Sequence, residues 1–175
     1  MIHYVAFLRA INVGGRNVKM DELKKHLAMR GFNNIGTYIQ SGNVIFDHAD
    51  TDPTAIADKI EQKLQKALGY EVRTFVRTIP ELDCIVDSWP FVHVPEEMGL
   101  HVSFLSAPPL ETAVKELMSL QNELEQFSIN GTEAYIMVKK GAYGETKFSN
   151  TFLEKKLKVA ATTRNWATVN KLRSM

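Results

Sequence analysis

The spacing of hydrophobic residues in the first part of the chain alternates between that of a strand and that of a helix. Residues 3–8 form an apolar, aromatic and β-branched run, which predicts a short buried strand ending before a pair of glycines. Met20, Leu23 and Leu27 then recur at intervals of three and four residues, which predicts an amphipathic helix. Gly31 follows at the position expected for a left-handed C-terminal cap.

Two β-rich segments and a second helix come next. Segments 35–40 and 43–46 flank a Ser-Gly pair, which predicts two antiparallel strands joined by a tight turn. Asp52 and Pro53 form the N-cap and first-turn signal of a helix, and an apolar stripe of helical period follows them. Residues 70–76 predict another strand. This part of the chain therefore has the order β-α-β-β-α-β.

A connector separates this pattern from a second one. Thr78 and Glu81 have the spacing of a capping box, which predicts a connecting helix before a proline-containing loop. Residues 100–106 then predict a strand, and residues 110–124 predict a helix.

The second pattern ends with a hairpin, a helix and a strand. Asn130-Gly131 lies between two β-rich runs and predicts a hairpin. Thr151 and Glu154 offer another capping box, after which residues 159–163 predict a strand. Trp166 then opens an apolar helical stripe at the end of the chain.

The repeated order predicts an α+β fold with two tandem ferredoxin-like (βαββαβ) halves, a helical connector and a C-terminal helix. We expect the N-terminal half at residues 1–78 and the connector at 79–99. The C-terminal half, with the terminal helix, is expected at residues 100–175.

Composition narrows the class of protein. Hydrophobic residues make up 45% of the 175 residues, which is enough apolar surface to form a core without disulfides. The 21 Lys and Arg against 20 Asp and Glu give a formal net charge of +1. The molecule as a whole is therefore not strongly attracted to nucleic acid or to an anionic membrane, and any polyanion site must be local.

The single cysteine and the amino-terminal residues bear on location. One cysteine, Cys84, excludes an intramolecular disulfide and fits a reducing compartment, and its apolar neighbours place it in the core of the connecting helix. The amino terminus lacks a basic region followed by a long apolar stretch, and no run approaches the ~18 to 20 apolar residues of a membrane span. We expect a cytoplasmic protein with no membrane partner; the sequence does not indicate an oligomeric state.

The segment "FLRAINVGGRNVKM" (residues 7–20) concentrates cations and amides around two glycines, just before a predicted helix. A helix start offers free N–H groups and partial positive charge to an anion, and glycine lets the backbone approach a ligand. The alternative is a solvated turn with surface cations. The candidate ligand residues of this loop are Arg9, Asn12, Gly14, Gly15, Arg16, Asn17 and Lys19.

A second Arg-Asn pair precedes the predicted terminal helix. Asn165 is a candidate N-cap, and Arg164 is a candidate anion clamp beside free helix amides. Trp166 fits a core position better than a base-stacking platform. Lys147 precedes another predicted helix, where it either faces a ligand or solvates the helix start.

Tyr38 and Gln40 share one face of their predicted strand and could present a polar, aromatic-bearing surface to a ligand.

Signals for covalent or metal chemistry are weak, because the chain has no G-x-S-x-G motif and its five histidines lack metal-ligand spacing. We expect no metal site, and no motif names a cofactor.

Four segments together resemble a known family. They are "RAINVGGRN", "TYIQSGNVIF", "TKFSNTFLEKKLKV" and "TTRNWATVNKL", which are similar to the signature blocks of the bacterial domain of unknown function family 1697. The resemblance implies a cytoplasmic α+β protein with two ferredoxin-like halves and no established activity. It also implies an Arg-Ser pair before Lys147, where this chain has Glu145-Thr146; that departure weakens an anion-binding role for this segment.

The leading hypothesis is a pocket for a small anionic ligand, such as a phosphorylated metabolite or a nucleotide, formed by the glycine-containing loop and the C-terminal Arg-Asn-Trp segment. A second class is an RNA or single-strand binding module that uses Tyr38 and Trp166, although the near-neutral charge disfavours it. A third is an enzyme with Tyr38, Asp21 or Glu22 in proton transfer. A purely structural or partner-binding role is the fourth.

Overall fold

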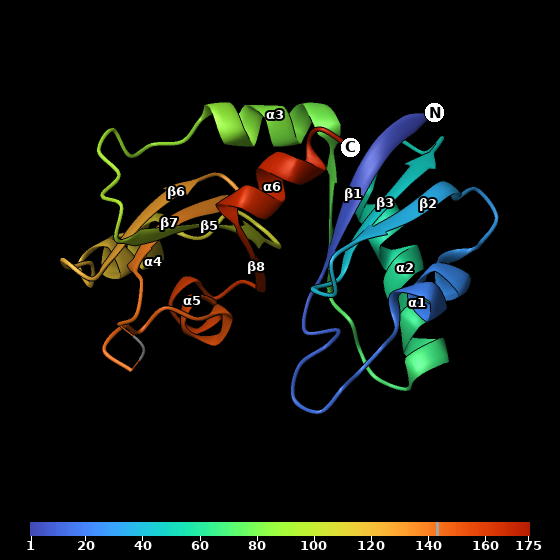
Figure 1. Ribbon diagram of the computed structural model, residues 1–175, viewed down its shortest axis with the longest axis horizontal. Coiled ribbons are helices and arrows are strands. Elements are labelled where there is room, and N and C mark those ends of the chain that lie inside the picture. Colours follow the sequence, from blue (N-terminus) through green and yellow to red (C-terminus); the bar gives the residue numbers. More distant parts are fainter. Residues whose placement is uncertain (143) are drawn as a thin grey trace. The chain divides into compact units, whose positions relative to one another are not determined.

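The computed structural model describes residues 1–142 and 144–175. Within these residues the fold is α+β, with six helices and two four-stranded antiparallel sheets (Figure 1). The chain divides into two compact units, Met1–Asp83 (unit 1) and Cys84–Met175 (unit 2), and α3 (Ile79–Asp87) runs across the division. Each unit is described by itself.

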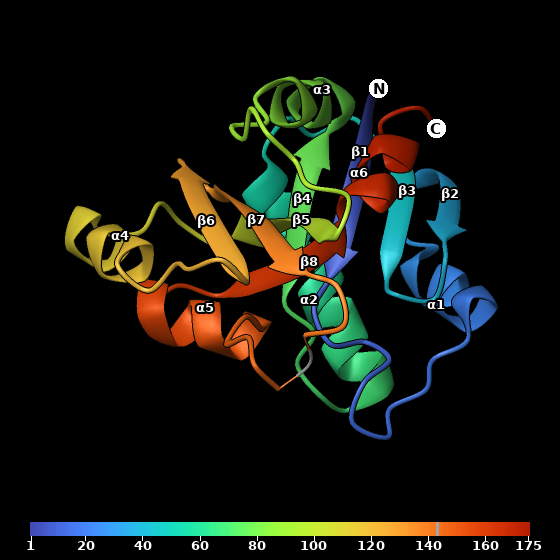
Figure 2. The ribbon, with the colours of Figure 1, turned by 60° about the vertical axis from the view of Figure 1, so that its left-hand side comes forward.

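Unit 1 has the element order predicted from its hydrophobic spacing. Its elements are β1 (Ile2–Leu8), α1 (Met20–Leu27), β2 (Asn33–Tyr38), β3 (Asn43–His48), α2 (Pro53–Leu68) and β4 (Thr74–Thr78). The sheet has the order β2-β3-β1-β4. Alternate residues of β1, Tyr4, Ala6 and Leu8, pack with buried residues of α1 and α2, so both helices cover one face of the sheet (Figures 1 and 2).

Unit 2 repeats that order. Its strands and helices are β5 (Met98–Leu105), α4 (Glu111–Met118), β6 (Glu125–Asn130), β7 (Glu133–Lys139), α5 (Asn150–Leu157), β8 (Ala161–Asn165) and α6 (Trp166–Leu172). The sheet has the order β6-β7-β5-β8, which corresponds strand for strand to that of unit 1. Leu117 of α4 and Leu153 of α5 pack on the sheet beside Ile136, so these helices cover one face.

Several predicted helix ends are confirmed. The Asp52 carboxylate accepts a hydrogen bond from the Thr54 N–H (2.9 Å) at the start of α2, and Gly69 caps its end with φ 78°. Thr78 and Glu81 form the predicted capping box at the start of α3. The Thr78 N–H donates to Glu81 Oε2 (2.7 Å), and the Glu81 N–H donates to Thr78 Oγ1 (3.3 Å).

Other predicted boundaries are wrong. The helix α1 ends at Leu27, with Ala28 as its C-cap, so Gly31 does not cap it. The positive φ of Gly31 (95°) instead serves the turn into β2, where an added Cβ would lie 3.0 Å from His48 Nε2. The N-cap of α5 is Ser149, whose hydroxyl accepts from the Phe152 N–H (3.0 Å), and the predicted cap at Thr151 lies inside the helix.

The remaining differences are shifts of element ends. The helix α4 stops at Met118, because Asn122 forms a turn in which its Oδ1 accepts from the N–H groups of Leu124 (2.7 Å) and Glu125 (3.2 Å). The last strand, β8, lies two residues later than predicted and includes the Arg164-Asn165 pair. This shift places the pair in a sheet rather than in a loop.

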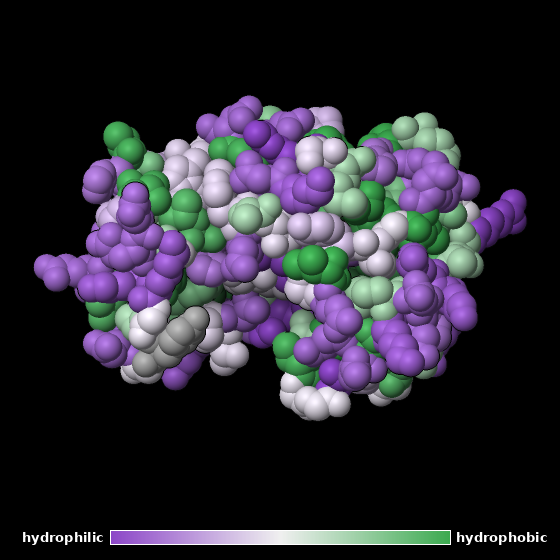
Figure 3. Space-filling model, in the orientation of Figure 1, coloured by the Kyte–Doolittle hydropathy of each residue, from purple (hydrophilic) through white to green (hydrophobic). Residues whose placement is uncertain are grey.

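The exposed surface of the described chain includes Cys84 and has no membrane-spanning helix beneath it. No helix in the described part of the chain is long and apolar enough to cross a membrane. On the face shown in Figure 3, hydrophobic residues are interspersed among hydrophilic ones. Cys84 is exposed, so its expected core position is wrong: Leu82, Ile85 and Val86 form the buried stripe of α3, and Cys84 lies outside it.

Candidate functional site

The predicted ligand residues of unit 1 gather at one end of its sheet, where the loop after β1 meets the β2–β3 turn. Asn12 holds this loop in place by side-chain hydrogen bonds. Its Nδ2 donates to the carbonyls of Val18 (3.2 Å) and Gln40 (2.9 Å), and its Oδ1 accepts from the Val18 N–H (2.6 Å). Asn12 therefore joins both ends of the loop to the turn, which is a structural use of its amide.

Gly42 makes this close approach possible. Its φ is 79°, and an added Cβ would lie 2.6 Å from Ile11 Cγ2. The Leu8 N–H donates to the Gly42 carbonyl (2.8 Å), which ties the turn to the end of β1. Only glycine fits both the backbone conformation and the space.

Two cationic residues of the loop, Arg16 and Lys19, are exposed, and Arg9 is half-buried. Gly14 (φ 62°) and Gly15 (φ 84°) are exposed, and the guanidinium carbon of Arg16 lies 4.0 Å from the centre of the Tyr70 ring. Lys19 occupies the N-cap position of α1 and makes no side-chain cap hydrogen bond. Arg9, Asn17, Tyr38 and Gln40 complete the set of predicted residues at this end of the unit.

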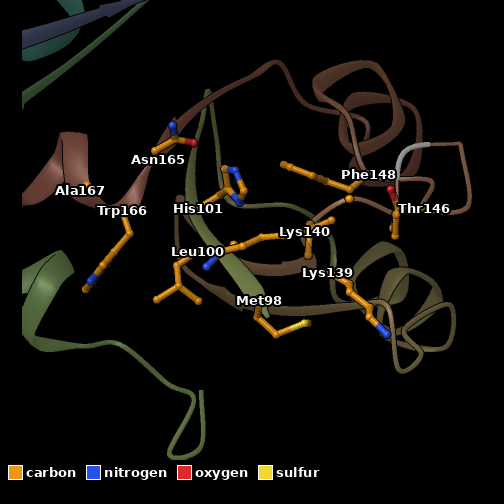
Figure 4. A pocket seen from close by; sticks show the side chains of 14 residues that line it. Met98, Leu100, His101, Lys139, Lys140, Thr146, Phe148, Asn165, Trp166 and Ala167 are labelled. Atoms are coloured by element: carbon orange, nitrogen blue, oxygen red, sulfur yellow. The ribbon is translucent and has the colours of Figure 1, made fainter. Parts of the chain in front are cut away.

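A cavity of about 680 Å³ lies in unit 2 (Figure 4). It is formed by the start of β5, the end of β7, the segment between β7 and α5, and the junction of β8 with α6. The lining residues that carry polar side chains are His101, Lys139, Lys140, Thr146, Asn165 and Trp166. The large apolar side chains in the lining are Met98, Leu100, Val138 and Phe148.

Strand pairing brings the polar residues together. His101 of β5 lies directly opposite Asn165 of β8, so both side chains project from the same face of the sheet. The rings of His101 and Phe148 have centroids 5.6 Å apart. Lys140, just after β7, donates from Nζ to the Glu96 carbonyl (2.7 Å), which attaches this edge of the cavity to the segment before β5.

His101 is the titratable group most affected by its surroundings in this cavity. Burial lowers its pKa below the ordinary value of 6.5, and the Gly99 backbone and the Asn165 side chain partly oppose that shift. Its Nδ1 is buried and has no hydrogen-bond partner among the described residues. The imidazole is therefore mostly neutral at pH 7.

A buried carboxylate holds the segment before α5 in place. Glu125 is fully buried, and its Oε2 accepts from the N–H groups of Lys147 (2.9 Å) and Phe148 (3.0 Å). These bonds position Thr146 and Phe148 at the cavity wall. Glu125 itself is not a lining residue.

Trp166 forms the aromatic edge of the cavity. Its ring lies 4.4 Å, centroid to centroid, from that of Trp89, which in turn contacts Tyr135 at 5.7 Å. Trp166 thus belongs to an aromatic cluster and also lines the cavity. These two tryptophans are the only ones in the chain, so tryptophan fluorescence reports on this unit.

The C-terminal residues that were predicted to bind one ligand, Arg164, Asn165 and Lys147, do not all line the cavity. Asn165 lines the cavity, whereas Arg164 does not. Arg164 is buried; one of its guanidinium nitrogens donates to Thr162 Oγ1 (3.0 Å) and to the Thr163 carbonyl (2.8 Å), and burial lowers its pKa to about 10. Lys147 is exposed and lies outside the lining.

Sequence reasoning missed most of the cavity. The residues it did not select are His101, Lys139, Lys140, Thr146 and Phe148. The Lys139-Lys140-Gly141 run at a strand end was the one available signal. No group of three or more His, Cys, Asp or Glu within the described residues could hold a metal ion.

The fold and the site together define an α+β protein of two similarly ordered four-stranded units, with a cavity in the second unit whose lining includes two lysines and a histidine. The chain belongs to the family described as "Protein of unknown function (DUF1697)", which matches residues 1–135 and confirms the predicted membership. The matched region includes His101 and ends before Lys139.

The fold is shared with a solved bacterial structure. It is similar to the conserved bacterial protein SP0830 from Streptococcus pneumoniae, with a TM-score of 0.72 and 21% sequence identity. The similarity covers 100% of this chain and 98% of that chain, and at this identity it concerns the fold alone. The comparison with curated proteins found no match.

Proposed function

We propose that the cavity of unit 2 binds a small anionic ligand that also carries an apolar or aromatic group. One observation carries this proposal: the described lining residues include Lys139, Lys140 and a histidine but no Asp or Glu. Both lysines are exposed, and cationic side chains without a lining carboxylate favour a negative charge through charge-assisted hydrogen bonds.

The shape and the apolar lining indicate the rest of the ligand. A volume of about 680 Å³ suits a small molecule. Phe148 and Trp166 offer ring faces, and Met98 and Leu100 offer aliphatic contacts. A phosphorylated metabolite or nucleotide with a planar ring fits this chemistry.

The loop of unit 1 is a second proposed anion contact. The exposed glycines and the cations Arg9, Arg16 and Lys19 support it, since glycine backbone and guanidinium groups both suit phosphate oxygens. It stays a prediction that this loop and Asn165 bind the same ligand. Arg16→Ala tests it: a shared ligand loses affinity, and separate sites leave binding in the cavity unchanged.

We also propose that each unit is a ferredoxin-like half. The support is the βαββαβ order and the strand orders β2-β3-β1-β4 and β6-β7-β5-β8, in which the first and third strands of each unit are central. A cytoplasmic location is proposed from the single cysteine.

Isothermal titration calorimetry with naphthalene-2-sulfonate tests the cavity proposal. This probe combines an aromatic ring with a permanent negative charge, and naphthalene-2-sulfonamide is its uncharged match. We expect the sulfonate to bind at least about tenfold more tightly, in line with a charge-assisted hydrogen bond. Equal affinity for the two compounds would contradict the proposal.

A matched pair of variants locates the binding. Lys140 and Lys115 are both exposed, but Lys140→Gln removes an ammonium group from a lining residue, whereas Lys115→Gln removes one on α4 outside the lining. We expect about tenfold weaker sulfonate binding for Lys140→Gln and no change for Lys115→Gln. Equal affinities in the two variants would place the anion elsewhere.

A further inference from the structure

His101 contributes an imidazole to the cavity lining, and one of its two ring nitrogens lacks a partner among the described residues. Its Nδ1 is buried without a hydrogen bond among the described residues, while the ring lies against Phe148 and opposite Asn165 (Figure 4). A buried polar atom without a partner costs free energy, so it calls for a specific explanation. A group that serves only packing would be better replaced by an apolar residue.

We propose that His101 couples anion binding in this cavity to proton uptake: the imidazole is neutral in the empty cavity and takes up a proton when an anion binds. This inference rests on the proposed anion site. It adds regulation by pH to that site, with affinity that rises as the pH falls.

The charges around His101 support this coupling. Lys139 and Lys140 belong to the lining at the end of β7, where the Lys139 side chain points away from His101 (Figure 4), and Asn165 lies on β8 without a charge. The segment before α5 contributes the exposed Lys147 outside the lining, and the buried Glu125 lies behind that segment with its Oε2 occupied by two backbone N–H groups. No carboxylate among the described lining residues competes with an incoming anion for the imidazolium.

The physical mechanism is electrostatic. Burial lowers the pKa of His101, because the imidazolium is poorly solvated, and the Gly99 backbone and the Asn165 side chain offset only part of that shift. An anion within about 4–6 Å favours the charged form and raises the histidine pKa by about one unit or more. By linkage, the same interaction makes the anion bind about tenfold more tightly for each pKa unit gained.

The test uses the full chain and naphthalene-2-sulfonate, whose charge does not change between pH 5.5 and about 8.5, so any pH dependence belongs to the protein. Titrations in two amine buffers of different ionisation enthalpy give the number of protons taken up on binding; sulfonate buffers are avoided because they compete. We expect tighter binding at pH 5.5 than at pH 8.5, with net proton uptake on binding and a gain that approaches about tenfold as the pH falls below the pKa of His101 in the free protein.

Two variants test whether the proton that is taken up on anion binding is bound by His101. His101→Gln should bind the sulfonate with little pH dependence, whereas His93→Gln, which changes an exposed histidine outside the lining, should behave as the wild type. If His101→Gln does not fold, the Cε1–H resonance of His101 in the wild type supplies the same answer. Its pKa should rise by about one unit when the sulfonate is added.

The outcomes separate this inference from the proposed function. Tight sulfonate binding with no proton uptake, or with unchanged pH dependence in His101→Gln, would overturn the role of His101 and leave the anion site standing. Absence of sulfonate binding throughout the pH range would overturn both.

Discussion

His48 of unit 1 and His101 of unit 2 are both shielded from solvent, but their hydrogen bonding differs. In unit 1, His48 is 6% exposed, packs against Phe32 at 4.8 Å between ring centroids, and accepts the Asp50 N–H at Nδ1 (3.0 Å). In unit 2, Nδ1 of His101 has no partner among the described residues, and the ring lines a cavity. The pKa of each is lowered by burial.

The difference shows what a lowered pKa does and does not indicate. Burial shifts both histidines in the same direction, but only His101 lies where a ligand could reach its ring. His48 is explained by packing and by one hydrogen bond. The satisfied Nδ1 of His48 thus marks a structural role, whereas the unsatisfied Nδ1 of His101, on a ring that lines a cavity, marks a functional candidate.

The largest expected difference between the units concerns their hairpin glycines. Gly42→Ala should lower the free energy of unfolding by about 3 kcal/mol, because the positive φ is strained for alanine and the new Cβ would meet Ile11. Gly131→Ala should cost only about 1 kcal/mol, because φ is 59° and no atom lies within 4 Å of the new Cβ. Urea unfolding measures both, and equal losses would contradict the crowded contact between the turn and the loop after β1.

A smaller effect is expected from the histidines themselves. His48→Ala should lower the free energy of unfolding by about 2 kcal/mol, because it leaves a cavity beside Phe32 and removes the partner of the Asp50 N–H. His101→Ala should cost less than about 1 kcal/mol, since the ring already borders open space. A greater loss for His101→Ala would show that its role is structural.

The pH dependence of stability follows from the same two residues. Each has a folded-state pKa below the 6.5 of an unperturbed histidine, so the unfolded chain binds protons more readily. Their contribution to stability is fully present above pH 6.5 and is lost as the pH falls through the folded-state pKa. We expect a lower free energy of unfolding at pH 5 than at pH 7.5, and a shallower decline in His48→Gln than in His93→Gln.

The smallest expected effect lies at the edge of the cavity. Glu145 is exposed and precedes Thr146, which lines the cavity, so its charge opposes an incoming anion through solvent. Glu145→Gln should tighten naphthalene-2-sulfonate binding about twofold at low salt, and the gain should shrink in about 0.5 M NaCl. The exposed Glu123→Gln is the control. A salt-independent gain would point to a direct contact instead of a screened repulsion.

Local sequence signals predicted much of the fold. Asp52 and Gly69 delimit α2, and Thr78 with Glu81 opens α3, because caps depend on residues within one turn. The predicted helix boundaries were wrong where another polar residue nearby formed the hydrogen bonds that end or begin the helix. Asn122 ended α4 early, and Ser149 replaced Thr151 as an N-cap, since several residue types can satisfy the same orphan N–H groups.

The sequence by itself determined the order of helices and strands and their repetition, because periodicity and capping act over short distances. Only the tertiary structure decided what the polar residues do. In the folded chain, Asn12 holds a loop by hydrogen bonds, Arg164 is buried beside Thr162, and His101 lies opposite Asn165 at a cavity. The reason is physical: strand register joins residues that are far apart in the chain, and burial decides which of their polar atoms are left for a ligand.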